Sequence, residues 1–290
     1  MISVVIPAFN EERAVHATVE SVRAVLAKID AGNAEVIVVD DGSSDRTAEE
    51  AERAGARVIR KPQNIGYGHS LKVGITAAKN DVIVITDADG TYPAESIPDL
   101  LAQYRKGFDM VVGSRTGKFY RESWLKSPLR RILQSLVEFT AGRAIPDVNS
   151  GLRVFSRKTI MPFFDHLSDA FSFTTSATLA YMLRRKYVEY VPIPYNQRIG
   201  STKVRLFRDS LRTLQYITQA ILFYNPLKIF LVLVFALVVG AGVLLLLGLF
   251  GFGFASTLAI QCLIAAALLF AIGMLADLIR QMGIRPENRD

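Results

Sequence analysis

Blocks of apolar and polar residues alternate along positions 1–114, and they predict strands separated by helices. Short runs rich in β-branched residues are typical of buried strands, and apolar residues three or four apart are typical of helices with one buried face. Crossover helices between strands require the strands to be parallel. The predicted strands are Ile2–Ile6, Glu35–Val39, Arg57–Ile59, Val82–Ile85 and Met110–Val112, and the predicted helices are about 11–28, one after Ser44 as a candidate cap, one ending near 79, and 94–106. The pattern therefore predicts an α/β fold with a doubly wound, mostly parallel sheet.

A second pattern begins near Asn225-Pro226, where the chain turns apolar. No charged residue lies between Lys228 and Asp277, and this tract is long enough for two membrane helices of about 20 residues each. The glycines within 250–256 supply a break, so we expect spans near 226–249 and 256–278 that form a hairpin. Both ends of a hairpin lie on one side, and the basic residues that flank it favour the cytoplasmic side. These flanking residues are Lys228, Arg280 and Arg285.

Between these two regions, basic and apolar residues mix. The stretch 119–144 combines arginines with leucines and aromatics, which suits a lipid interface, although a solvated charged face is an equal alternative. The segments 171–185 and 187–193 predict a further helix and strand. Apolar residues then recur every three to four positions from 203 to 223, which predicts a helix lying along the headgroups. We therefore divide the chain into a domain at 1–204, a juxtamembrane amphipathic helix at 205–224, two transmembrane helices within 225–280 and a cytoplasmic tail at 281–290.

Net charge and cysteine content indicate which surface the protein binds and which cellular compartment it occupies. The net charge of +7 suits an anionic membrane surface better than nucleic acid, given the predicted hairpin. A lone cysteine, Cys262, excludes an intramolecular disulfide and is consistent with a reducing compartment. The chain opens directly into a predicted strand, so we expect no signal peptide. The sequence thus predicts a multi-pass integral membrane protein whose large domain is cytoplasmic.

Two predicted strands end in acidic pairs, and these carry the candidate chemistry. Asp40 and Asp41 follow one strand, and Asp87 and Asp89 follow another. The carboxyl ends of parallel strands form the ligand-binding edge of an open α/β sheet. Carboxylates there suit Mg²⁺ or Mn²⁺, and they also suit hydrogen bonds from a ribose or base. For Asp87 and Asp89 taken alone, the alternative is that they merely begin a turn before Pro93.

Other site classes are not supported. The chain has neither a Walker motif nor a complete GxGxxG, which argues against an ATPase and a hydride-transfer enzyme. Gly66 and Gly68 would let backbone approach phosphates before a helix, but a lone GxG is more often an ordinary loop. The three histidines lack the spacing of zinc ligands.

The ordered motifs of this region resemble those of family 2 glycosyltransferases with the GT-A fold. The motifs are PAFNEE at 7–12, VVDDGS at 38–43, NIG at 64–66, DADG at 87–90 and GSR at 113–115. The later DVNSGLR at 147–153 and RIGSTK at 198–203 are similar to the polyprenyl-phosphate branch of that family, which includes dolichol-phosphate mannose synthases and undecaprenyl-phosphate glucosyltransferases. The resemblance covers about residues 1–205 in motif detail.

This resemblance implies roles for particular residues. Asp87 and Asp89 would hold the cation, Arg198 and Lys203 would neutralise the leaving diphosphate, and Asp147 would orient substrate or support Arg153. The acceptor phosphate would be held by Arg115, Arg131 and Ser135, with Arg130 as the alternative to Arg131. Nucleotide binding is expected of Pro7, Ala8, Phe9, Asn10, Glu11, Asp40, Asp41, Asn64, Gly66, Asp87 and Ala88.

The implied activity is inverting transfer of a hexose from a nucleotide diphosphate sugar to undecaprenyl or dolichyl phosphate. A UDP-sugar is favoured over GDP-mannose, because Thr91 stands where mannose synthases often carry Gln. An ionised acceptor phosphate needs no dedicated general base. The alternatives are a membrane glycosyltransferase with another acceptor and a catalytically silent nucleotide-sugar-binding scaffold. Gly240 and Gly242 in the first span would permit close helix contacts in a homo-oligomer.

Overall fold

The computed structural model describes residues 1–29, 34–117, 127–199, 214–215, 217–219, 221–222, 225–250 and 253–283, with the backbone alone for 127–133. Contacts divide the chain into two compact units, Met1–Ile217 and Thr218–Asp290, and each is described by itself. The predicted amphipathic helix at 205–224 lies largely outside the described residues. Those of its residues that are described, such as 217–219, are helical.

Across the described part of the first unit, seven strands form one sheet in the order β3-β2-β1-β4-β6-β5-β7. The pairs β1–β2, β2–β3, β1–β4 and β5–β7 are parallel, whereas β6 is antiparallel to both β4 and β5. The predicted mostly parallel sheet is therefore confirmed. The strands are β1 (Ile2–Ala8), β2 (Glu35–Asp40), β3 (Arg57–Arg60), β4 (Val82–Ile85), β5 (Met110–Thr116), β6 (Arg153–Ser156) and β7 (Val188–Pro194).

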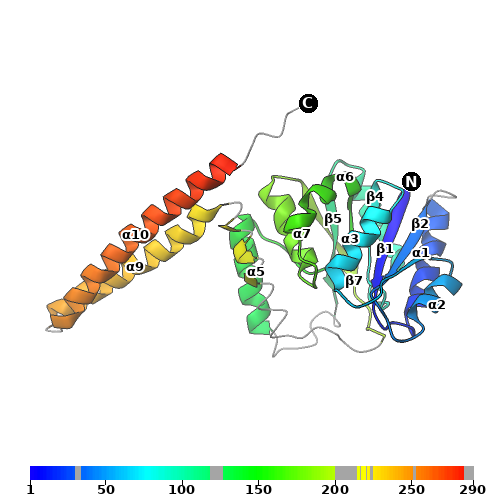
Figure 1. Cartoon of the computed structure of the whole chain (residues 1–290), viewed down its shortest axis with the longest axis horizontal. Helices are drawn as coiled ribbons and strands as arrows, with labels where there is room; N and C mark the ends of the chain where they lie inside the picture. Colours follow the sequence, from blue (N-terminus) through cyan, green and yellow to red (C-terminus); the bar gives the residue numbers. More distant parts are fainter. Residues whose placement is uncertain are drawn as a thin grey trace. The chain divides into compact units, whose positions relative to one another are not determined.

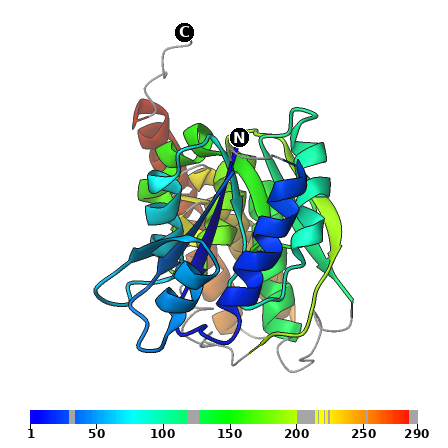
Figure 2. The ribbon, with the colours of Figure 1, turned by 90° about the vertical axis from the view of Figure 1, so that its right-hand side faces the viewer.

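Helices cover both faces of this sheet, as Figures 1 and 2 show. On one face, Val4 and Ile6 of β1 join a core with Val15 and Val19 of α1. On the other face, α3 packs on β1 and β2 and contacts α7. The helices of this unit include α1 (Val15–Ile29), α2 (Thr47–Arg53), α3 (Tyr67–Ala77), α4 (Ile97–Tyr104) after the short 3-10 helix η1 (Ala94–Ser96), α5 (Ser127–Ala141), α6 (Arg157–Ile160), η4 (Met161–His166) and α7 (Phe173–Leu183).

Strand β6 is the main feature that the sequence pattern did not predict. It is four residues long and pairs Val82 to Ile85 of β4 with Ser156 to Arg153. It also separates β4 from β5, which would otherwise be neighbours in a simple doubly wound sheet. A strand this short carries too little alternation to be recognised, and its first residue is an arginine that is fully buried.

The predicted helix boundaries are less accurate than the helices themselves. Helix α1 starts at Val15 rather than at about 11, and α3 ends at Ala77 rather than near 79. The expectation that Ser44 caps α2 is wrong. The side chain of Asp45 accepts a hydrogen bond from the Thr47 amide at 3.0 Å instead, so the residue next to Ser44 supplies the oxygen at the start of that helix.

The described part of the second unit is dominated by two apolar helices, α9 (Pro226–Leu249) and α10 (Gly253–Gly283), which run side by side (Figure 1). The most apolar 18-residue windows of α9 and α10 have mean hydropathies of 3.2 and 2.5. Both helices are therefore long and apolar enough to cross a membrane. Small residues lie between them: a Cβ built on Gly273 would be 2.6 Å from the Phe230 Cβ. By contrast, a Cβ on Gly240 or Gly242 would meet no atom within 4 Å, and the expected homo-oligomer stays a prediction.

Candidate active site

The two acidic pairs follow neighbouring parts of the sheet, as the sequence pattern predicts. Strand β1 lies between β2 and β4 and is parallel to both, so the carboxyl ends of all three strands reach the same edge. Asp40 ends β2 opposite Ala8, while Asp87 and Asp89 follow β4 in the next turn. Gly90 allows this turn with a φ of 74°. The edge that binds ligands in open α/β sheets therefore carries both acidic pairs.

Asp87 lies between a hydroxyl and a glycine. The Tyr67 hydroxyl donates a hydrogen bond to Asp87 Oδ1 at 2.8 Å. On the Gly151 side there is no room for a side chain, because a Cβ there would lie 2.7 Å from Asp87 Oδ1. Burial, and next the negative charge of Asp89, raise the pKa of Asp87 to about 7.

Asp89 is buried and has polar partners on two sides. The Thr91 hydroxyl and amide donate to Asp89 Oδ1 at 2.6 and 3.1 Å. Arg198 Nη1 lies 3.3 Å from Asp89 Oδ2, and Arg198 Nη2 lies 3.1 Å from Glu11 Oε1. Arg198 thus links the acidic turn after β4 to the loop after β1. Thr91, whose role was open from the sequence, is a fully buried donor that orients Asp89.

The electrostatics of this turn suit a divalent cation. Two carboxylates in one short turn are stabilised by a positive ion, and oxygen ligands match Mg²⁺ and Mn²⁺. Among the described residues, no group of three or more acidic, histidine or cysteine side chains is arranged to hold a metal. A cation on one or two carboxylates that completes its shell with substrate phosphates and water is the usual arrangement for Mg²⁺. Asp87 and Asp89 would be the two carboxylates of such a site, and their role as metal ligands stays a prediction.

The residues of the other acidic pair differ in their contacts. Asp41 forms a buried ion pair with Lys61 and accepts hydrogen bonds from the amides of Ile65 and Gly66 at 3.1 and 2.9 Å. These contacts are those of a structural residue that holds the β3–α3 loop. Asp40 accepts from the Ser43 amide at 3.0 Å and from the Ser43 hydroxyl. Of the two, Asp40 is the stronger candidate for contact with a nucleotide.

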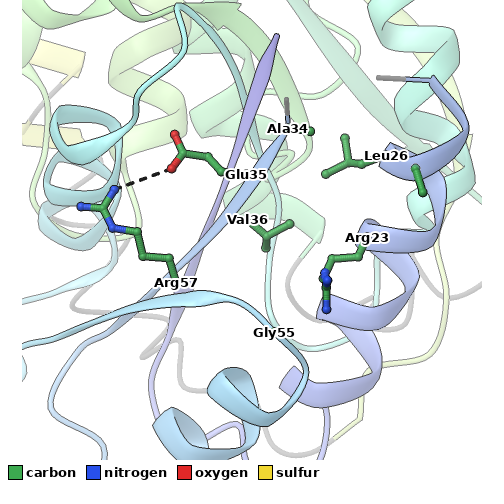
Figure 3. A pocket seen from close by; sticks show the side chains of 8 residues that line it. Arg23, Leu26, Ala34, Glu35, Val36, Gly55 and Arg57 are labelled. Carbon is green, nitrogen blue, oxygen red and sulfur yellow. Dashed lines mark ion pairs between the residues drawn. The ribbon is translucent and has the colours of Figure 1, made fainter. Parts of the chain in front are cut away.

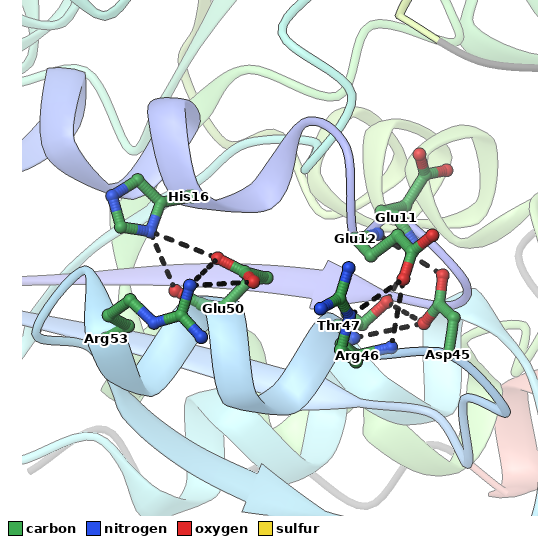
Figure 4. A network of polar contacts seen from close by, with 8 residues as sticks. All are labelled: Glu11, Glu12, His16, Asp45, Arg46, Thr47, Glu50 and Arg53. Carbon is green, nitrogen blue, oxygen red and sulfur yellow. Dashed lines mark hydrogen bonds and ion pairs between the residues drawn. The ribbon is translucent and has the colours of Figure 1, made fainter.

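The loop after β1 is fixed to the loop after β2. Asn10 adopts a positive φ of 53°, and its amide donates to the Ser43 hydroxyl at 2.9 Å. The Glu11 amide donates to Thr47 Oγ1 at 2.8 Å, a contact visible in Figure 4. Pro7 and Ala8 form the end of β1, and Phe9 to Glu11 follow it. The predicted nucleotide-binding segments at 7–11 and 40–41 are therefore adjacent.

Arg115 and Asp147 form a close pair at the end of β5. Arg115 Nε and Nη2 lie 2.7 and 2.8 Å from the two carboxylate oxygens of Asp147, and the Arg115 amide donates to the same group at 3.1 Å. The guanidinium also lies 5.3 Å from the centre of the Tyr195 ring. Bidentate pairing fixes the plane of a guanidinium, so Asp147 orients Arg115.

The hydrogen bonds of Arg153 go to groups other than the Asp147 side chain, while the negative charge of Asp147 lies close enough to act on Arg153, so the support of Arg153 by Asp147 stays a prediction. Arg153 is fully buried and donates to the carbonyls of Ser150 and Val148, each at 2.8 Å. It also donates to Thr178 Oγ1 at 2.8 Å. Burial lowers the pKa of Arg153. Arg153 therefore holds the 148–150 segment in place through its backbone carbonyls, while Asp147 pairs with Arg115.

Other predicted site residues are less well defined. Lys203 lies outside the described residues, and so does the side chain of Arg131 or its alternative Arg130. Ser135 is exposed on α5, and Asn64 is exposed in the β3–α3 loop. Ala88 is buried between the two acidic residues, and its carbonyl accepts a hydrogen bond from Thr18. The roles of all these residues stay predictions.

The glycines of the predicted GxG loop have a different immediate partner. A Cβ on Gly66 or Gly68 would lie 2.5 Å from the Asp169 carbonyl oxygen or 2.1 Å from that of Ser168. In this structure the glycines therefore let the start of α3 pack against the 168–170 segment. A contact between Gly66 and a phosphate stays a prediction.

A pocket of about 360 Å³ lies elsewhere in the first unit (Figure 3). It is lined by Arg23 and Leu26 of α1, by Gly55, and by Glu35 at the start of β2. Since β2 runs from Glu35 to Asp40, this pocket is at the opposite end of the strand from the acidic edge. Its charged side chains have partners: Arg57 lies 3.6 Å from Glu35, and Arg23 donates to the Ala54 carbonyl at 2.7 Å.

Sequence reasoning missed Tyr67 and Gly151 as neighbours of Asp87. A signal for Tyr67 existed, because α3 follows β3 and must begin at the carboxyl edge of the parallel strands. Nothing comparable marked Gly151, since its position depends on β6, which the pattern did not reveal.

Comparison with known proteins agrees with this geometry. The profile of the Glycosyl transferase family 2 domain matches residues 3–163, more than half of the chain. A dolichyl-phosphate hexose transferase of Haloferax volcanii is 34% identical over 208 residues, which cover 71% of this chain and 87% of the relative. An undecaprenyl-phosphate 4-deoxy-4-formamido-L-arabinose transferase of Edwardsiella ictaluri is 31% identical over 236 residues, covering 78% of this chain and 69% of the relative.

A solved structure shares the fold. Glucosyl-3-phosphoglycerate synthase from Mycobacterium tuberculosis, crystallised with Mn²⁺, UDP and glucosyl-3-phosphoglycerate, superimposes with a TM-score of 0.61 at 21% identity. The match covers 76% of this chain and 79% of the synthase. With the mixed seven-strand sheet across the described residues and the acidic turn at its carboxyl edge, these matches establish a GT-A fold. The chain is a glycosyltransferase of family 2.

Proposed function

We propose that the protein transfers a hexose, with inversion, from a nucleotide diphosphate sugar to a polyprenyl phosphate at a membrane. The proposal depends on one observation above all: an acidic pair, the half-buried Asp87 and the buried Asp89, follows a central strand at the ligand edge of a family 2 glycosyltransferase. The relatives from Haloferax volcanii and Edwardsiella ictaluri are named for dolichyl and undecaprenyl phosphate. Two helices able to cross a bilayer give this chain access to such an acceptor.

The donor is proposed to be a UDP-sugar. Asp40 and the adjacent loop at 7–11 would form the nucleotide side of the site, while Asp87 and Asp89 would hold Mg²⁺ or Mn²⁺ next to the diphosphate of the donor. The bound cation would stabilise the negative charge that develops on the departing diphosphate. Arg198 already lies beside Asp89, so it adds positive charge at the same place. Lys203 is proposed to contribute in the same way.

The acceptor side is proposed to be built around Arg115. Its guanidinium is held by Asp147 and lies over Tyr195, so it offers N–H groups in a fixed plane. Arg131 and Ser135 of α5 are proposed to join it at the acceptor phosphate. A phosphate monoester has a second pKa of about 6 and is mostly ionised at neutral pH. Its oxygen forms the bond to the anomeric carbon as the carbon–diphosphate bond breaks, and no side chain has to remove a proton.

The proposed location is the cytoplasmic face of a membrane, with α9 and α10 as a multi-pass anchor. Basic residues near the ends of these helices support that orientation through the excess of Lys and Arg on cytoplasmic segments.

The assay of this function is extraction of labelled sugar into an organic phase. Full-length protein in detergent is expected to move label from a radioactive UDP-hexose to added undecaprenyl or dolichyl phosphate, using a panel of donors. EDTA is expected to abolish the transfer, and Mn²⁺ or Mg²⁺ to restore it. Label found only in a saccharide or protein would indicate a different acceptor, and binding of UDP without any transfer would indicate a silent scaffold.

A substitution in the acidic turn gives an independent check. Asp89→Asn is expected to lower transfer by at least about 100-fold while the protein stays folded, because a metal ligand is lost. Asp99→Asn, on an exposed position of α4, is the matched control and is expected to behave as wild type. Equal transfer by both variants would rule out the proposed role of Asp89.

A further inference from the structure

We propose that Tyr67 is a positioning residue that holds Asp87 in the orientation in which it takes the divalent cation. This inference rests on the cation site of the proposed function. Tyr67 is the first residue of α3, and its hydroxyl donates to Asp87 Oδ1 at 2.8 Å. A carboxylate that accepts one directed hydrogen bond keeps lone pairs on both oxygens for a cation, but loses the freedom to rotate.

The surroundings of Tyr67 fix where its hydroxyl points. Gly66 and Gly68 on either side lie against the carbonyl oxygens of residues 168 and 169, where no side chain would fit. The His69 amide donates to the Asp169 carbonyl at 3.0 Å, which ties the first turn of α3 to the same segment. The Tyr67 ring stacks on Phe171, with centroids 5.6 Å apart and planes at 22°. The ring is therefore held between its own helix and the 168–171 segment.

A second contact limits Asp87 from another direction. A Cβ built on Gly151 would lie 2.7, 2.8 and 2.9 Å from Oδ1, Oδ2 and Cγ of Asp87. The carboxylate therefore packs directly against the Gly151 backbone. Gly151 is itself fixed, because its amide donates to the buried Tyr92 hydroxyl at 2.7 Å.

These contacts counteract the electrostatic repulsion between the carboxylates of Asp87 and Asp89. Asp87 and Asp89 lie in one turn after β4, and two carboxylates so placed repel each other. This repulsion disfavours an Asp87 carboxylate close to Asp89 unless other groups hold it in place. A donor at Oδ1 and a backbone surface behind the carboxylate keep it in place before the cation arrives, which is how outer-shell groups strengthen metal binding.

The test is Tyr67→Phe in the full-length protein in detergent. This change removes the hydroxyl and keeps the ring that stacks on Phe171. Mn²⁺ is titrated in the presence of UDP, and free Mn²⁺ is followed by electron paramagnetic resonance. We expect the Mn²⁺ dissociation constant to rise about 10-fold, the low end for loss of an outer-shell partner. In the transfer assay the KM for Mn²⁺ should rise, kcat at saturating Mn²⁺ should recover, and Tm should not change.

Two further variants sharpen the test. Tyr187→Phe makes the same chemical change at a 70% exposed position just before β7, and is expected to bind Mn²⁺ as wild type. Gly151→Ala places a methyl group against the Asp87 carboxylate, and is expected to weaken Mn²⁺ binding as well. Wild-type Mn²⁺ affinity in Tyr67→Phe overturns the proposal. The proposal is also overturned if Tyr67→Phe loses transfer activity together with a lower Tm, and saturating Mn²⁺ does not restore that activity.

The outcome separates this inference from the proposed function. If wild-type protein binds Mn²⁺ with UDP but transfers no sugar to polyprenyl phosphate, the proposed acceptor fails, while a weaker Mn²⁺ affinity of Tyr67→Phe still supports the role of Tyr67. If wild-type protein binds no Mn²⁺ in the presence of either UDP or GDP, both proposals fail together.

Discussion

Asp147 shows how a single residue can act on the site through another. Its side chain is 1% exposed and engages Arg115 through both oxygens, and it also accepts from the Asn149 amide at 3.1 Å. Removing one partner of a buried ion pair leaves the other charge uncompensated, which costs more than the pair contributes. Asp147 is therefore important for stability as well as for the direction of the Arg115 guanidinium.

Asp147→Asn is expected to lower the free energy of unfolding by about 2–3 kcal/mol, somewhat less than full removal of a buried partner because the amide oxygen still accepts one hydrogen bond. Thermal unfolding followed by circular dichroism measures the change. Asp169→Asn is the matched control, since Asp169 is 55% exposed in its pair with Lys72 and is expected to cost less than about 1 kcal/mol. A similar Tm for both variants would contradict the structural role of Asp147.

Helix α3 sets the position of Tyr67, the partner of Asp87, relative to the sheet. Its Gly74 faces β1 and β2 so closely that a Cβ there would lie 2.4 Å from Val5 Cγ1 and 3.0 Å from Val39 Cγ2. Both valines are fully buried core residues that cannot move aside. Close approach of α3 to the sheet at Gly74 also sets the position of Tyr67 two turns earlier on the same helix.

Gly74→Leu is expected to destabilise the fold by about 2–3 kcal/mol, because overpacking forces the helix away from the sheet. Thr76→Leu inserts the same side chain at an exposed position of α3 and is expected to change stability by less than about 0.5 kcal/mol. Chemical denaturation of both variants measures the difference. Transfer activity should fall only in Gly74→Leu, and equal stability of the two variants would show that α3 tolerates the larger side chain.

Elements with a strong periodic pattern were predictable, and those that depend on distant partners were not. Four apolar β-branched residues identify β4, and the acidic residues after it mark the edge of the sheet. Arg153 made β6 hard to predict, because a charged residue is expected in a buried strand only when its hydrogen-bond acceptors are known, and these come from distant parts of the chain. In the same way, Asp40 and Asp41 are equivalent in sequence, and only the position of Lys61 on β3's carboxyl side distinguishes them.

At the scale of the whole molecule, a polar catalytic unit and an apolar anchor are joined in one chain. The outward faces of α9 and α10 carry large apolar side chains, such as Phe235 at 70% exposure and Leu249 at 82%. Soluble monomers rarely expose apolar surface on this scale, so these faces suit lipid. The net charge of +7 adds attraction to anionic headgroups.

Epitope tags at the two termini are expected to report the same side of the membrane, since a two-helix hairpin returns the chain to the side from which it entered. Protease added to inside-out vesicles should remove both tags, and protease added to intact spheroplasts should remove neither. Resistance of the protein to alkaline carbonate extraction is the control for integration. Protection of one tag alone in inside-out vesicles would mean that only one of the two helices crosses.

The insertion of β6 between β4 and β5 has a consequence for biosynthesis. Chains fold from the amino end as they leave the ribosome. The first four strands can associate early, but the gap beside β4 closes only after residues 153–156 have emerged, and with them Gly151 and the partner of Arg115. A nascent chain halted before that point would lack the Arg115–Asp147 pair and the contact of Asp87 with Gly151, and the two apolar helices emerge later still. We therefore expect the candidate site to be completed only late in synthesis, shortly before the two apolar helices leave the ribosome.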